Sequence, residues 1–123
     1  MARYCPPCKF DRNLGSSSAY KGYYAPNIVR SKDLIAWEES LFKPIMKHSD
    51  EDKQIANPKL TQEQRDRIAK AADLNNSDVD FCEFQGKTII TYSWGNQTGI
   101  EHLAEARYDG AEADFLRAFF PMP

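Results

Sequence analysis

The chain lacks several signatures that would assign a protein to a class at once. No apolar run approaches the ~20 residues that a transmembrane helix needs, and the first segment, MARYCPPCKFDRNLG, has no apolar core of a secretory signal. A phosphate-binding glycine-rich loop, a G-x-S-x-G elbow and an H-E-x-x-H motif are also missing. We therefore expect a cytoplasmic protein, or a secreted or periplasmic one if the N-terminus is truncated.

An excess of basic charge is missing too. The 16 Lys and Arg residues stand against 18 Asp and Glu residues, which gives a net charge of -2. A protein that binds nucleic acid through its surface needs a basic face, so we expect no nucleic-acid partner and no membrane partner. A length of 123 residues fits one ordinary domain with a modest core.

Cysteine is scarce, with three residues in all. Cys5 and Cys8 form a C-P-P-C motif, which can be half of a zinc site or a redox pair. A zinc site needs more ligands, and only Cys82, His48 and His102 remain. We expect no metal and no cofactor, and we interpret Cys82 as a small core residue. The alternative, a redox or zinc protein, would require bound zinc or a reversible disulfide.

The spacing of apolar, capping and turn residues predicts a mainly β fold with helical insertions, of the α+β class. Residues 1–22 are expected to be an irregular tail, and residues 23–123 a single domain. The predicted elements are a strand at 23–30 interrupted by Pro26, a helical turn at 50–55 capped by Ser49, a helix from the Thr61-x-x-Gln64 capping box to about Ala72, strands at 81–84, 87–94 and 100–107, a turn at Gln85–Gly86, and a helix at 111–119.

Two aspartates stand where the first strand of the second half begins. Asp78 and Asp80 are two residues apart, so on a strand they point to the same face. Two desolvated carboxylates on one face resist ionising together, which suits acid–base chemistry. The alternative is that residues 75–78, Asn-Asn-Ser-Asp, form a polar loop in which Asp78 bonds the local backbone.

Four more side chains could share a site with these aspartates. Glu101 and His102 are neighbours in a strand, so they face opposite sides and at most one of them joins the aspartates. Trp94 and Tyr92 could stack on sugar rings, although single aromatic residues in a strand are often core residues.

Two segments resemble a known family. IVRSKDLIAWEESLFKPIM is similar to the element that closes a blade in five-bladed β-propeller glycoside hydrolases of the arabinanase and β-xylosidase type, and DFCEFQGKTIITYSWGNQTGIEHLAEA is similar to their next blade. The resemblance spans roughly residues 25–110. It implies an antiparallel, propeller-blade-like sheet within an incomplete propeller. The position that matches the family's pocket aspartate is Asp80, with Asp78 next.

The resemblance implies a glycoside-hydrolase-like fragment, related to enzymes that act on plant or algal polysaccharide through paired carboxylates. Its catalytic candidates are Asp80, Asp78, His102 and Glu101, and its substrate-binding candidates are Trp94 and Tyr92. A single blade leaves strand edges unpaired, so we also expect a homo-oligomer. The alternative is a non-catalytic oligomeric protein, or a module that binds carbohydrate weakly.

Overall fold

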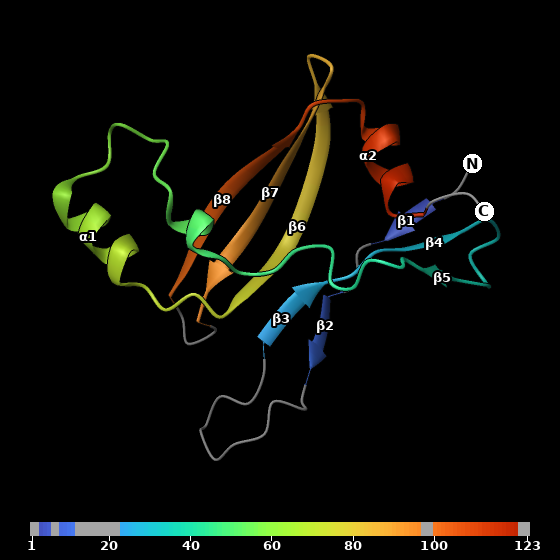
Figure 1. The fold of residues 1–123 in the computed structure, drawn as a ribbon, viewed down its shortest axis with the longest axis horizontal. Helices are drawn as coiled ribbons and strands as arrows, with labels where there is room; N and C mark the ends of the chain where they lie inside the picture. Colours follow the sequence, from blue (N-terminus) through green and yellow to red (C-terminus); the bar gives the residue numbers. More distant parts are fainter. Residues whose placement is uncertain (1–2, 6–7, 12–22, 97–99, 121–123) are drawn as a thin grey trace.

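The computed structural model describes residues 3–5, 8–11, 23–96 and 100–120 (Figure 1). Its centre is an antiparallel sheet of three consecutive strands, β6 (Asn75–Phe84), β7 (Lys87–Gly95) and β8 (Glu101–Tyr108), in the order β6-β7-β8. With two α-helices in the described residues, the fold is mainly β, as the sequence predicts. Whether the sheet is a propeller blade stays a prediction.

Two smaller sheets lie beside the central one. β1 (Arg3–Cys5) pairs with β4 (Val29–Ser31), which pairs with β5 (Glu38–Glu39), and β2 (Cys8–Asp11) pairs with β3 (Tyr23–Pro26). The predicted irregular tail is therefore wrong for β1 and β2. Their backbone groups find partners in β4 and β3, and such pairing between distant segments leaves little trace in local sequence.

The first central strand begins earlier than predicted and contains a β-bulge. β6 starts at Asn75, in the segment that its composition marks as a loop. Ser77 pairs with Ser93 and Asp80 with Thr91, so two residues of β6 face one of β7. Asp78, the first of the two, has φ of 51°. Bulges bend a strand and shift its pairing register, and here the shift falls between Ser77 and Asp80.

The turn between β6 and β7 matches its prediction. Gln85 and Gly86 have φ values of 51° and 73°, which is the pattern of a two-residue hairpin turn whose twist suits the flanking strands.

One face of the central sheet is covered and the other is open. The covered face carries Trp94, Tyr92 and Ile90 of β7, and it packs against α2 (Glu112–Ala118) and the 3-10 turn η1 (Asp50–Lys53). The aromatic rings of Phe81 and Phe115 join α2 to the sheet, with centroids 5.8 Å apart. Side chains on the opposite face, such as Leu103, stand in solvent.

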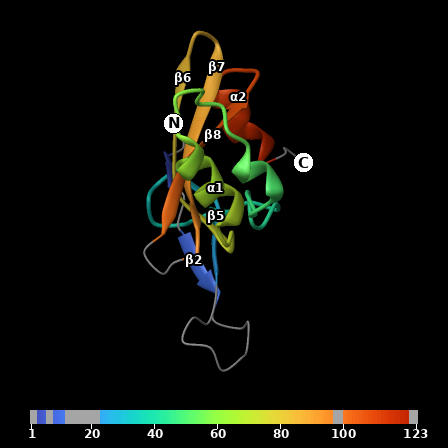
Figure 2. The ribbon, with the colours of Figure 1, turned by 90° about the vertical axis from the view of Figure 1, so that its left-hand side faces the viewer.

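The helix α1 (Gln62–Lys70) begins where its capping box predicts. The Thr61 hydroxyl accepts a hydrogen bond from the Gln64 backbone N–H, and the Gln64 side chain accepts one from the Thr61 backbone N–H. None of its residues is buried. Figures 1 and 2 show that α1 lies beyond β8, at the far end of the sheet from α2. The helix therefore lies on the surface and contributes little to the hydrophobic core.

The predicted turn before α1 is also present. η1 begins after Ser49, whose backbone N–H donates to a carboxylate oxygen of Asp52 at 3.1 Å. In the described part of the chain no helix is long and apolar enough to cross a membrane.

Candidate functional site

An open groove runs between α1 and the first residues of β8. It consists of two hollows of about 710 and 420 Å³. Both are lined by Arg67, Ile100 and His102, so the two hollows adjoin each other. The remaining lining residues are Leu60, Glu63, Gln64, Asp66, Ile68, Lys70, Ala71, Ala72, Asn96 and Glu101. The groove therefore combines some apolar surface with acids, bases and amides from both walls, and it is more polar than most pockets for drug-sized ligands.

The inner wall depends on a close approach of the backbone at Gly95. Gly95 ends β7 opposite Glu101. A Cβ atom on Gly95 would lie 2.3 Å from the carbonyl oxygen of Ile100 and 3.1 Å from the Cα atom of Glu101. Because both of these atoms belong to the backbone, they cannot turn aside, and only glycine lets the start of β8 lie where it does.

Replacing Gly95 by alanine should lower the free energy of unfolding by about 1–2 kcal/mol, because the backbone must shift to relieve the overlap. Urea denaturation measures this change. Gly86→Ala is the control, since its Cβ would meet no atom within 4 Å and only its φ of 73° is unfavourable. A larger loss in Gly86→Ala than in Gly95→Ala would contradict the steric argument.

His102 is held in the groove by an aromatic partner. It pairs with Trp94 across β7 and β8, and the two rings stack with centroids 4.6 Å apart. Its Nε2 atom is shielded from solvent and has no hydrogen-bond partner in the described residues. The ring is therefore fixed in orientation, while one of its nitrogens remains unsatisfied within the protein.

A pair of carboxyl groups, Asp52 and Asp73, flanks the segment that carries α1. The Tyr92 hydroxyl donates to Oδ1 of Asp52 at 2.6 Å, and the Asn76 side-chain amide donates to Oδ2 at 3.0 Å. Burial alone would raise the pKa of Asp52. The hydrogen bonds from Tyr92, Asn76 and the Ser49 backbone outweigh burial, so the pKa of Asp52 lies below its usual value.

The pKa of Asp73, the other carboxyl group of the pair, is shifted in the opposite direction. Both carboxylate oxygens of Asp73 are inaccessible to solvent, and neither makes a hydrogen bond of good geometry in the described residues. Burial, followed by the neighbouring Asp52 carboxylate, raises the pKa of Asp73 to about 7. Burial and then Asp52 also raise the pKa of Tyr92, which keeps its hydroxyl protonated as a donor. The pair thus shares one proton near neutral pH.

Asp52 and Asp73 stand at the two ends of the segment that forms the outer wall of the groove. Asp52 precedes the excursion of residues 53–72, which contains α1, and Asp73 follows it directly. Asp52 is bonded to Tyr92 of β7 and Asn76 of β6, which ties the first end of the excursion to the central sheet. At the second end, the backbone N–H of Leu74 donates to the carbonyl oxygen of Gly95 at 2.8 Å.

The predicted aspartates lie on the other, open face of the sheet. The Asp78 carboxylate accepts hydrogen bonds from Ser93 at 2.7 Å and Ser77 at 3.1 Å. Asp80 accepts one from the Phe81 backbone N–H at 2.9 Å. Ser93 and Thr91, the cross-strand partner of Asp80, share a face, so the two aspartates emerge on one side as predicted. They do not meet His102, whose partner Trp94 is on the covered face.

The predicted stacking residues lie inside the protein. Trp94 is 1% exposed and Tyr92 is 7% exposed, so neither offers a ring face to a sugar in this structure. Instead, the ring of Trp94 stacks on His102, and the hydroxyl of Tyr92 donates a hydrogen bond to Asp52. Glu101 and His102 both line the groove, because it reaches the end of β8, where both sides of the strand are accessible.

Sequence reasoning missed Asp52, Asp73 and Arg67. Asp52 stands in the predicted helical turn, where acids are common as caps, and Asp73 is an isolated acid before a strand. No spacing links two carboxylates 21 residues apart, so their contact could be found only from the tertiary structure.

The structure bears on two further predictions, one for the cysteines and one for a metal site. Cys82 is exposed, so its prediction as a core residue is wrong: it follows Phe81 in β6 and so faces the open side of the sheet. The side chains of Cys5 and Cys8 lie outside the described residues. Among the residues whose side chains are described, no group of three or more His, Cys, Asp or Glu is placed to hold a metal ion.

Comparison with known proteins adds no assignment to this geometry. No family model matches the chain, and no curated protein or solved structure matches it.

Proposed function

We propose that this chain is a binding module whose groove between α1 and β8 takes a hydroxyl-rich ligand of the oligosaccharide class. The observation that carries the proposal is the mixed lining of the groove. Ile68 and Ile100 supply apolar surface, while charged groups such as Arg67 and Glu63 stand beside it. A sugar ring has apolar C–H faces and a rim of hydroxyl groups, which are both donors and acceptors, so such a lining complements it.

The opposed charges of the groove support a neutral ligand over an ion. Arg67 and Glu63 form an ion pair at 3.2 Å, Lys70 adds a second base, and Asp66 and Glu101 add two further acids. A strongly charged ligand of either sign would meet repulsion from some of these groups. A hydroxyl group can donate to the acids and accept from the bases, so a neutral polyol uses both.

The proposal predicts that Arg67→Gln weakens oligosaccharide binding roughly tenfold, because one hydrogen bond to a charged donor is lost. Isothermal titration with a panel of plant and algal oligosaccharides measures the dissociation constant. Arg107→Gln is the matched control: Arg107 is equally exposed and also paired with a glutamate, but it lies on β8 away from the groove. Equal effects of the two substitutions, or no binding by the wild-type chain, would reject the groove as a sugar site.

Glycoside hydrolysis is the second candidate function, and it follows from the resemblance to propeller glycosidases. One observation favours it: carboxylates line the groove on both walls, Glu101 of β8 in the smaller hollow and Glu63 and Asp66 of α1 in the larger one. Hydrolysis needs two carboxyl groups flanking one glycosidic bond.

Hydrolysis of aryl glycosides tests this candidate directly. If the groove is catalytic, Glu101→Gln should abolish release of the aryl group, while Asp80→Asn should leave it unchanged. Loss of activity in Asp80→Asn alone would place the chemistry on the open face of the sheet. No activity in a folded chain that binds sugar would leave the binding function.

A further inference from the structure

The hairpin of β4 and β5 has a turn that its own side chains hold in place. The Ser31 hydroxyl accepts a hydrogen bond from the Leu34 backbone N–H at 2.8 Å. The Asp33 carboxylate accepts from the backbone N–H groups of Ile35 and Ala36, at 2.9 Å each. These bonds, first of all that from Ile35, lower the pKa of Asp33, so the carboxylate is ionised at neutral pH. These side-chain hydrogen bonds therefore fix the conformation of the turn.

This turn holds a large apolar residue in an unfavourable conformation. Leu34 has φ of 65°, in the left-handed region that bulky side chains rarely enter. Such a conformation persists only where surrounding bonds impose it, and it is common at recognition sites.

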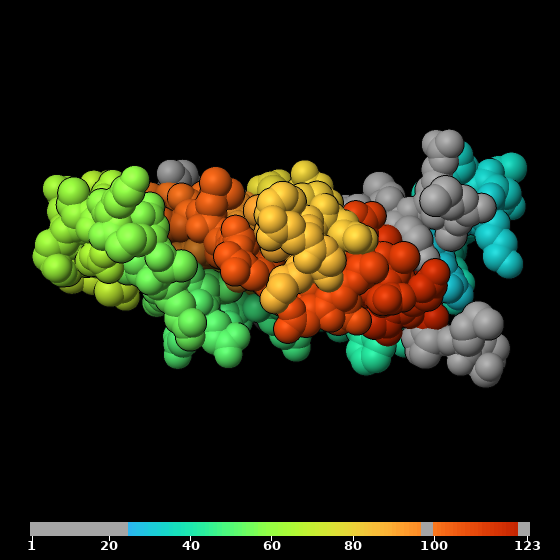
Figure 3. All heavy atoms as spheres, turned by 90° about the horizontal axis from the view of Figure 1, so that it is seen from above, coloured from blue at the N-terminus to red at the C-terminus, as the bar shows by residue number. Residues whose placement is uncertain are grey.

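The hairpin displays apolar side chains to solvent. Nine large apolar residues are exposed in the described part of the chain, and five of them belong to residues 34–42. We name these five the apolar hairpin: Leu34, Ile35, Trp37, Leu41 and Phe42. Ile35, at its tip, is 86% exposed. Figure 3 shows the cyan atoms of the hairpin projecting beyond α2 at one end of the molecule. A concentration of exposed apolar side chains marks an interaction surface.

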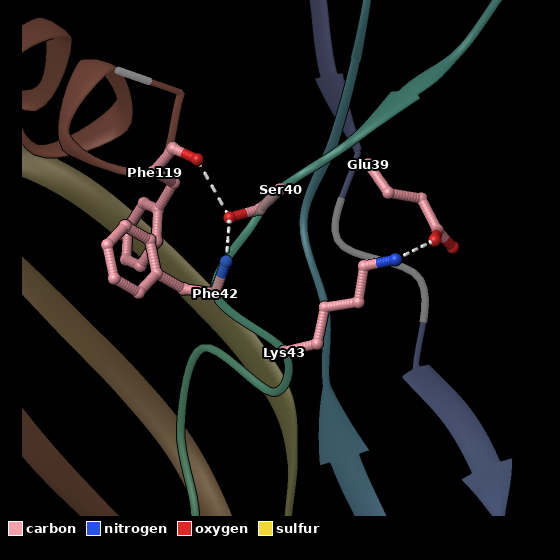
Figure 4. A network of polar contacts seen from close by, with 5 residues as sticks. All are labelled: Glu39, Ser40, Phe42, Lys43 and Phe119. Carbon is pink, nitrogen blue, oxygen red and sulfur yellow. Dashed lines mark hydrogen bonds and ion pairs between the residues drawn. The ribbon is translucent and has the colours of Figure 1, made fainter.

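The base of the apolar hairpin is anchored to Phe119, the residue that follows α2. Ser40, which is buried, donates to the carbonyl oxygen of Phe119 at 2.8 Å and accepts from the backbone N–H of Phe42 at 3.0 Å (Figure 4). The rings of Phe42 and Phe119 meet edge to face, with centroids 6.5 Å apart. Because the hairpin is ordered before it meets a partner, association costs less conformational entropy.

The charges around the apolar hairpin indicate the partner. Three bases, Arg30, Lys32 and Lys43, are matched by three acids, Asp33, Glu38 and Glu39. Arg30 pairs with Glu38 at 2.7 Å, and Lys43 pairs with Glu39. A rim with equal numbers of both signs is neutral as a whole and complementary to itself when a two-fold axis sets each base near an acid of the other copy.

We propose that two copies of this chain associate through the apolar hairpin, in a two-fold contact that buries Ile35 and Trp37 at its centre. A protein partner of strong net charge would gain nothing from this balanced rim, whereas a second copy offers the same apolar surface and the same alternation of charge. The contact uses a hairpin tip, so it differs from the pairing of sheet edges or faces expected from the sequence.

Sedimentation equilibrium of the full chain tests the proposal. Wild-type protein should fit a monomer–dimer equilibrium, and Ile35→Lys should raise its dissociation constant at least roughly tenfold, because it places two like charges at the centre of the contact. Leu103→Lys is the matched control: Leu103 is 85% exposed on the open face of the sheet, so the dimer should be unchanged.

A second variant separates the shape of the turn from its apolar surface. Ser31→Ala removes the hydrogen bond to Leu34 but leaves every apolar side chain in place, so it should weaken the dimer while circular dichroism shows a folded chain. A wild-type chain that stays monomeric at roughly 1 mM, where even weak dimers form, would overturn the proposal. So would a dimer that Leu103→Lys weakens as much as Ile35→Lys does.

Discussion

Replacing Tyr92 by phenylalanine should lower the free energy of unfolding at pH 7 by about 3 kcal/mol, because it leaves a buried carboxylate without its closest donor. The hydroxyl of Tyr92 lies 2.6 Å from Oδ1 of Asp52, and both side chains are buried. Phenylalanine retains the ring, so the loss measures the hydrogen bond and its electrostatic effect on Asp52. Urea denaturation gives the change in unfolding free energy.

Tyr108→Phe is the control for this measurement, since Tyr108 is a half-buried tyrosine at the other end of the sheet, next to Phe115. The substitution at Tyr92 should also raise the pKa of Asp52, since the hydroxyl is the largest of the influences that lower it. A loss below about 1 kcal/mol, the worth of an ordinary neutral hydrogen bond, would mean that Asp52 is not ionised when folded.

Asp73→Asn should stabilise the protein at pH 8 and remove most of its loss of stability between about pH 4 and pH 7. The pKa of Asp73 is raised from 3.8 to about 7 in the folded state. In that interval the folded chain keeps a proton that the unfolded chain has released, so the stability of the wild type falls as pH rises and becomes level above about 7. Asparagine has no charge to repel Asp52.

The expected gain at pH 8 is about 2 kcal/mol, which is roughly half of the value that the full shift would give at 1.4 kcal/mol per pKa unit, because solvent near the pair screens the repulsion. Thermal and urea unfolding at pH 5 and pH 8 measure it. Asp66→Asn, at an exposed position of α1, is the matched control. If Asp73→Asn proves less stable than the wild type at pH 8, the proposed repulsion between Asp52 and Asp73 is wrong.

The contribution of Asp52 to stability depends on pH in the opposite direction. Its pKa is lowered in the folded state, so its contribution is present above the unfolded pKa and is lost as pH falls through the lower folded value. Together the two groups predict their greatest contribution to stability at about pH 4, where that of Asp52 is almost complete and that of Asp73 is not yet lost. Since Asp52 and Asp73 flank residues 53–72, pH should affect the wall of the groove before the rest of the fold.

The amino-acid sequence by itself determined those elements whose causes are local. The capping box of Thr61 and Gln64 set the start of α1, and Ser49 set the start of η1. Glycine at position 86, with its freedom to adopt positive φ, set the turn between β6 and β7. Each depends on residues within a few positions of one another, so its cause is visible in the local sequence.

Only the tertiary structure decided which side chains share a site. It brought Asp52 to Asp73 across 21 positions, buried Trp94 and Tyr92 as supports, and placed His102 on the face opposite to Asp78 and Asp80. It also found strand partners for β1 and β2. The physical reason is that burial, pairing of distant strands and repulsion between carboxylates depend on which segments meet. Local patterns fix the segments, whereas the balance of packing over the whole chain fixes how they meet.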